Sequence, residues 1–159
     1  MLQVLVKRRF LVRLSVFSLL LLAVGCGQPA SSQVSEIYAP GNKALDGYDP
    51  VAFFTDSMPV KGSANYSFNW KGADWLFASA EHLDQFKADP DKFAPQFGGY
   101  CAYGCSQGHK APTKPETWTI VNGKLYLNYN GDVRKKWTAD RDALIEKENA
   151  NWPTVKTQK

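Results

Sequence analysis

The chain has 159 residues, of which 44% are hydrophobic and 13% aromatic, and its formal net charge is +4. Residues 1–25 contain four of the 19 basic residues and none of the 15 acidic ones, so the rest of the chain carries no net charge. This balance argues against nucleic-acid binding, and the two cysteines that follow residue 26 are too few for a disulfide-stabilised scaffold.

The first 25 residues have the order of an export signal. Basic residues at positions 7–13 precede an apolar run over residues 14–24, which is shorter than the roughly 20 residues that span a bilayer. Gly25 then precedes Cys26, and this junction resembles the lipobox of bacterial lipoproteins, although Leu usually stands where Ala23 does. The resemblance implies a lipoprotein-type signal peptide over residues 1–25 and a lipidated Cys26. Ordinary cleavage near Cys26 is the alternative.

Residues 26–44 are small, polar and interrupted by proline and glycine, which is typical of a flexible tether. A lipidated Cys26 would attach the protein to the extracytoplasmic face of a membrane. Gly27 would favour the outer membrane in a cell that has two. The membrane is therefore the expected partner, and the sequence does not identify a protein partner.

The folded domain is expected over residues 45–155, and its first half contains a hairpin and short helices. Strands at residues 66–70 and 75–78 are joined by a turn. Ser79 is predicted to cap a helix of about ten residues, which Asp89 and Pro90 end while beginning another. A short helix, a tight turn and a second short helix should follow, ending near residue 107.

The second half of the domain should contain another hairpin and a C-terminal helix. The hairpin is predicted over residues 117–129 around Asn122 and Gly123, since both residues tolerate positive φ. Thr138 is predicted to cap a helix from about residue 139 to residue 150, closed by Trp152 and Pro153. These elements predict an α+β fold: a small single domain of β-hairpins packed with short helices and a C-terminal helix.

Several motifs resemble the YHS family, in particular its exported single-domain members. They are Asp49-Pro50-Val51, Trp70-Lys71-Gly72, Phe86 to Phe93, Gly98 to Ala102 and Gly123 to Tyr129. The resemblance covers nearly everything after the tether and implies metal binding, with copper as the expected ion. Many members carry cysteines after Asp-Pro-Val and after the second strand. Ala52, Ala78 and His82 stand at those positions here, so the implied thiol ligands are absent from them.

Cys101, Cys105 and His109 are the principal metal candidates. Their four-residue spacing would place both thiols on one helix face, and thiolate and imidazole ligands suit zinc or Cu(I). Gly108 weakens the series, because a helix that stops there would move His109 out of line. Two alternatives stay open: Cys101 is a small buried residue with His109 at the surface, or the thiols form a reversible disulfide.

Three further residues are weaker candidates. His82, in the first predicted helix, is more typical of a solvated helix residue than of a ligand. Asp46 and Asp49 could bind a hard cation, but aspartate beside glycine and proline is common in turns.

The sequence lacks the nucleophile-elbow, phosphate-loop and zinc-protease motifs, so we do not expect an enzyme. The expected function is a lipid-anchored extracytoplasmic YHS-type domain that binds copper, zinc or a small ligand. A thiol-redox protein that uses Cys101 and Cys105, and a structural or interaction module of the cell envelope, are the alternatives.

Overall fold

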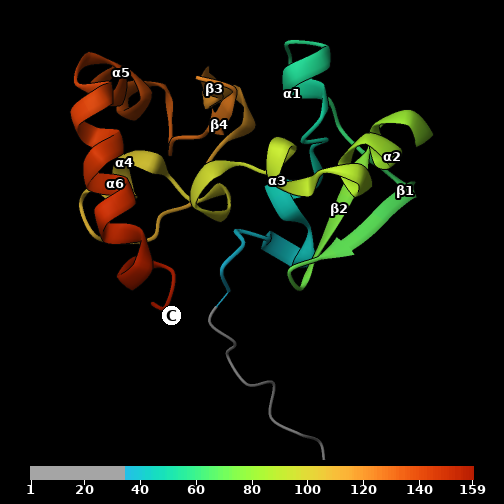
Figure 1. Cartoon of the computed structure of the whole chain (residues 1–159), viewed down its shortest axis with the longest axis horizontal. Helices are drawn as coiled ribbons and strands as arrows, with labels where there is room; N and C mark the ends of the chain where they lie inside the picture. The colour runs from blue at the N-terminus through green and yellow to red at the C-terminus, as the bar shows by residue number, and fades with distance from the viewer. Residues whose placement is uncertain (1–34) are drawn as a thin grey trace, which may run out of the picture. The chain divides into compact units, whose positions relative to one another are not determined.

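The computed structural model describes residues 35–159 (Figure 1). Its strands form two antiparallel pairs: β1 (Ser63–Trp70) with β2 (Ala73–Phe77), and β3 (Thr119–Val121) with β4 (Lys124–Tyr126). The α-helices are α1 (Ala52–Thr55), α2 (Ala80–Ala88), α3 (Pro90–Phe93), α4 (Ala102–Ser106), α5 (Gly131–Ala139) and α6 (Arg141–Val155). Four 3₁₀-helices complete the elements: η1 (Pro40–Asn42), η2 (Ala44–Gly47), η3 (Gln96–Gly99) and η4 (Pro115–Thr117). The predicted α+β fold class is confirmed.

The first hairpin forms as predicted, and its second strand, β2, supplies much of the first core. Lys71 and Gly72 make the turn with φ values of 50° and 77°, and β1 begins three residues before the predicted start. Trp75 and Phe77 of β2 are fully buried, and their rings lie 5.0 and 5.2 Å from the ring of Phe86 on α2. Helix α2 therefore packs its inner face on the hairpin.

Two predicted helix caps are confirmed by their hydrogen bonds. The Ser79 hydroxyl accepts from the backbone N–H of His82 at 3.1 Å, at the start of α2. The Asp89 carboxylate accepts from the N–H of Lys92 at 3.2 Å, at the start of α3. Each cap satisfies a helix N–H that has no partner within its own helix, and this is why the two helices begin where they do.

The folded structure extends further toward the N-terminus than the predicted boundary at residue 45. Ile37 is 3% exposed and Ala44 is fully buried, and both belong to the first core. Tyr38 N–H donates to Gly98 O at 2.9 Å, which attaches this segment to η3. The last part of the predicted tether, residues 37–44, is thus packed against the domain. Residues 26–34 of the predicted tether, Cys26 among them, and the predicted signal peptide lie outside the described residues.

The second hairpin turns at Asn122 and Gly123, with φ values of 52° and 72°, as predicted. Its outgoing strand is shorter than expected, because β4 ends at Tyr126. Leu125 and Leu127 point into the first core, whereas Tyr126 belongs to a second core beside α4, α5 and α6. Alternating side chains of β4 and of the residue after it therefore serve both cores.

The C-terminal prediction was wrong in its boundaries, because two helices replace one. Asn130 caps α5 by accepting from Val133 N–H at 2.9 Å, whereas Thr138 lies inside α5 and donates to Arg134 O at 2.8 Å. Helix α6 continues through Pro153 to Val155, which is 1% exposed in the second core. Burial of Val155 favours the last turn. No helix among residues 35–159 is long and apolar enough to cross a membrane.

Replacing Gly98 by alanine should strongly destabilise the domain. Gly98 has φ +61°, and an added Cβ would lie 1.8 Å from the backbone oxygen of Glu36. Gly41 is the matched control, with φ +59° and no atom within 4 Å of an added Cβ. Urea unfolding should show a loss of roughly 2–5 kcal/mol for Gly98→Ala and about 1–2 kcal/mol for Gly41→Ala. Equal losses would contradict the contact with Glu36.

Candidate functional site

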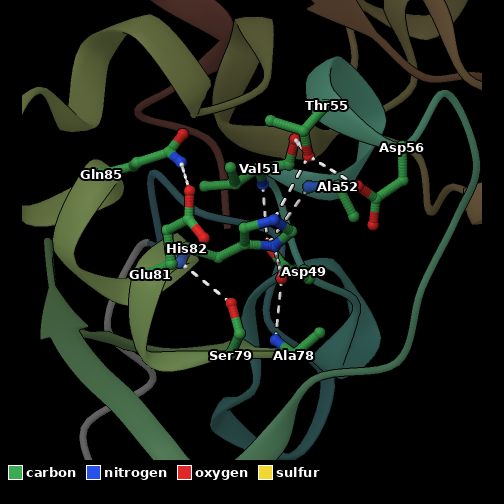
Figure 2. A network of polar contacts seen from close by, with 10 residues as sticks. All are labelled: Asp49, Val51, Ala52, Thr55, Asp56, Ala78, Ser79, Glu81, His82 and Gln85. Carbon is green, nitrogen blue, oxygen red and sulfur yellow. Dashed lines mark hydrogen bonds and ion pairs between the residues drawn. The ribbon is translucent and has the colours of Figure 1, made fainter.

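A fully buried carboxylate lies between the first hairpin and α1 (Figure 2). Asp49 Oδ1 accepts from the N–H groups of Val51 and Ala52 at 2.8 and 3.4 Å, and Oδ2 accepts from Ala78 N–H at 2.8 Å. The aspartate thus holds the start of α1 and the end of β2 together. These contacts fit the predicted turn role of Asp49.

His82 completes this network, because its Nδ1 lies 2.6 Å from Asp49 Oδ2. Its side chain is only 13% exposed, so it is not the solvated helix residue that the sequence favoured. A carboxylate accepts hydrogen bonds, and this assigns the imidazole proton to Nδ1. In the neutral ring Nε2 therefore carries the lone pair. The Ser79 cap positions His82 in the first turn of α2.

The Nε2 end of the imidazole contacts the hydroxyl of Thr55, which in turn contacts the carboxylate of Asp56. Thr55 Oγ1 lies 3.3 Å from Nε2 and also lies 2.9 Å from Asp56 Oδ1 (Figure 2). Thr55 and Asp56 are both exposed, at the end of α1. A carboxylate that holds the far nitrogen of an imidazole is the usual arrangement around metal-binding histidines, and it also orients general bases.

Asp46 and Asp49 do not share a site. Asp46 is exposed and forms an ion pair with Lys61, whose Nζ lies 3.5 Å from Asp46 Oδ2. Asp49 is buried and uses its oxygens within the network just described. One aspartate is therefore at the surface and the other in the interior, and only Asp49 contacts another candidate residue.

The structure buries the two thiols and exposes His109. Cys101 and Cys105 are free, with exposures of 2% and 0%. Cys101 caps α4, where its Sγ accepts from Gly104 N–H at 3.4 Å, and Cys105 packs in the second core. Gly108, at φ +83°, follows α4, and His109 beyond it is exposed. Within residues 35–159, no three histidine, cysteine or acidic side chains are grouped to hold a metal ion.

Burial makes the thiols weak nucleophiles. Burial, with the charges of Cys101 and Glu148 adding to it, raises the pKa of Cys105 to about 12. Burial also raises the pKa of Cys101, although hydrogen bonds from nearby backbone groups oppose it. Thiolate is the reactive form of cysteine, so little of either residue is reactive at neutral pH.

Sequence reasoning missed Glu148, which is fully buried beside the second core. Its Oε1 accepts from Trp137 Nε1 at 2.6 Å, and its Oε2 has no partner among residues 35–159. Burial raises the pKa of this carboxyl to about 7, against the opposing hydrogen bond from Trp137. The available signal was its spacing: Glu148 lies four residues after Leu144 and seven before Val155, on the buried face of α6.

Comparison with known proteins identifies one segment of the chain. Residues 51–97 match the family model of the YHS domain. Searches of curated proteins and of solved structures return no match. The matched segment contains Thr55, Asp56 and His82, and begins two residues after Asp49. Cys101, Cys105 and His109 all lie beyond it.

The free energy of unfolding should fall as pH rises because of Glu148. Its pKa is about 7 in the folded protein against a reference value of 4.5, so the unfolded chain releases this proton first. Stability should therefore decrease between about pH 4.5 and 7, by about 3 kcal/mol, and then level off. Glu148→Gln keeps an acceptor for Trp137 and cannot ionise. Urea unfolding measured at several pH values should show that the free energy of unfolding falls less with pH in the variant than in the wild type. An equal fall in both proteins would contradict the assignment.

Proposed function

This chain contains a YHS domain over residues 51–97, and we propose that the domain binds a copper or zinc ion through His82 without catalysing a reaction. The observation that carries the proposal is the 2.6 Å contact between Asp49 Oδ2 and His82 Nδ1. It fixes the ring and leaves Nε2 as the coordinating atom. A metal ligand whose other nitrogen is held in this way gains both orientation and basicity.

The resemblance to the YHS family implies that Ala52, Ala78 and His82 stand where many members carry cysteines, and all three contact Asp49. Ala52 N–H and Ala78 N–H both donate to its carboxylate, and His82 contacts the same group. His82 is therefore the one residue of the three that has a coordinating side chain. This convergence supports His82 as the remaining ligand of the family's metal position.

The neighbouring side chains suit nitrogen- and oxygen-binding ions. The Thr55 hydroxyl contacts His82 Nε2 and the Asp56 carboxylate contacts that hydroxyl, so both would add oxygen ligands. Such a set fits Cu(II) or Zn(II), whereas buried thiols would select Cu(I). Because few protein ligands converge, we expect weaker binding than at a four-ligand structural zinc site.

The thiol-based functions have less support. Cys101 and Cys105 remain a second candidate pair for copper or zinc and the basis of the thiol-redox alternative. Their burial and raised pKa values oppose both uses at neutral pH. An interaction module of the cell envelope requires neither the thiols nor the imidazole, and the loss of metal binding would leave it as the remaining alternative.

Metal titration of the full chain tests the proposal, with Cys26→Ser in every sample so that this thiol cannot contribute. Calorimetry with Cu(II) and Zn(II) should show one binding event, weakened at least tenfold by His82→Gln and by less for Asp56→Asn. The chain has two histidines, so His109→Gln is the matched control and should change nothing. Electron paramagnetic resonance of the Cu(II) sample should show nitrogen coordination that His82→Gln removes.

Two outcomes of this titration would overturn the imidazole site. One is unchanged affinity in His82→Gln. The other is that the Cys101→Ala, Cys105→Ala double variant loses binding while the His82→Gln variant keeps it. That result would assign the site to the thiols.

The proposal extends to an extracytoplasmic location, with Cys26 as the lipid attachment site. It rests on the order of basic, apolar and small residues before Cys26. In a bacterial host, labelled palmitate should be incorporated into the wild-type chain and recovered with membranes. Cys26→Ala should abolish the labelling, while Cys101→Ala should not. Labelling that persists in Cys26→Ala would contradict this attachment.

A further inference from the structure

A hollow of about 170 Å³ lies away from the His82 network. The residues that line it include Glu36, Trp70, Lys71, Asp91, Gln96 and Trp152. They come from the segment before η1, the first hairpin, α3, η3 and α6, so the hollow forms only when distant parts of the chain meet. None of the ten residues drawn in Figure 2 lines it. A ligand here would be independent of a metal at His82.

Two half-buried indoles give the hollow an aromatic lining. Trp70 is held by edge contacts with Trp75 and Phe86, at ring distances of 5.6 and 5.7 Å. Trp152 is held by Phe97 at 5.6 Å. Within residues 35–159, neither indole N–H has an acceptor, whereas the buried indoles of Trp75 and Trp137 both do. The N–H groups of buried indoles usually find such partners, whereas those of these two half-buried indoles remain available to a ligand.

The remaining lining combines hydrogen-bond donors with acceptors. Glu36 and Asp91 supply carboxylate oxygens, and Lys71 and Gln96 supply N–H donors. Lys71 Nζ lies 3.7 Å from Asp91 Oδ1 and 4.2 Å from the centre of the Trp70 ring. The ammonium therefore already occupies the cation position over this indole, which disfavours a cationic ligand. The two carboxylates disfavour an anion.

We propose that this hollow binds one neutral sugar ring, either as a free monosaccharide or as the terminal residue of a glycan. A sugar ring offers apolar C–H faces to the indoles and hydroxyl groups that both donate and accept. The volume is below the 300–1,000 Å³ usual for larger organic ligands, which limits the occupant to a single ring. Gly98 helps to form the site, because its missing side chain lets Glu36 approach η3.

Saturation-transfer NMR on the metal-free full chain with Cys26→Ser, at millimolar ligand, tests the proposal. The probes are glucose, galactose and N-acetylglucosamine, each free and as a β-linked disaccharide, with tetramethylammonium and inorganic phosphate as charged comparisons. At least one neutral sugar should bind saturably. Equal affinity of monosaccharide and disaccharide indicates free sugar as the ligand, and tighter disaccharide binding indicates a glycan end.

Matched variants locate the sugar at the hollow. Asp91→Asn and Gln96→Ala should each weaken binding about tenfold, and Trp152→Phe, which removes only the indole N–H and part of the ring, by at least threefold. Asp132→Asn is the matched control. Asp132 is 86% exposed and lies 3.6 Å from a lysine Nζ, and Asp91 is 85% exposed and lies 3.7 Å from one. The proposal is overturned if no neutral sugar saturates, if only a charged probe binds, or if the Asp91 and Gln96 variants bind normally.

Discussion

The buried carboxylate of Asp49 is the constraint on which the matched domain depends. A charge without solvent contact is costly in a protein interior unless its oxygens accept hydrogen bonds. Asp49 accepts them from α1, from the end of β2 and from the ring of His82. The hairpin, α1 and α2 therefore share one acceptor. The orientation of the imidazole follows from the same contacts that hold these elements together.

The two cores differ in the chemistry they contain. The first core is built from aromatic and aliphatic side chains around the first hairpin. The second contains the Cys105 thiol, and Cys101 is buried at the start of α4. The fully buried Glu148 and Asn128 lie beside it, each with one polar atom that has no partner among residues 35–159. Burial disfavours the charged forms of the carboxyl and the thiols alike. Reactive sulfur chemistry at neutral pH would therefore require the second core to open, whereas the His82 ring is already partly exposed.

Local chemistry explains which features could be predicted from the sequence. Some features depend only on residues within a few positions of one another, namely the caps at Ser79 and Asp89 and the turn at Asn122 and Gly123. Their conformational preferences can therefore be recognised in the sequence. The choice of Asn130 over Thr138 as a cap was not readable in this way, because both residues are suitable caps. Packing of Val155 in the second core extends α6 past Pro153.

The site was harder to predict than the fold, because its partners are distant in sequence. Asp49 and His82 are 33 positions apart, and only the folded hairpin brings them within 2.6 Å. Regular spacing made Cys101 and Cys105 conspicuous, but spacing carries no information about the aromatic residues that surround them. Likewise, the polar segment before residue 45 hides one large apolar residue, Ile37, whose burial depends on Gly98 accommodating the backbone at Glu36.

The resemblance to the YHS family bears on what the proposed site would bind. The resemblance implies that Ala52, Ala78 and His82 stand where many members carry thiolates, which are soft ligands that require deprotonation. Among the three, only His82 offers a coordinating side chain, an imidazole that would bind in its neutral form. The buried Asp49 then has a second role, since it keeps the proton on Nδ1 and leaves Nε2 to the ion. A backbone network that serves folding in the domain thereby also selects the tautomer that metal binding needs. Under this proposal the structural and functional roles of Asp49 cannot be separated by removing its carboxylate, but they can be separated at His82, whose loss leaves the three backbone donors in place.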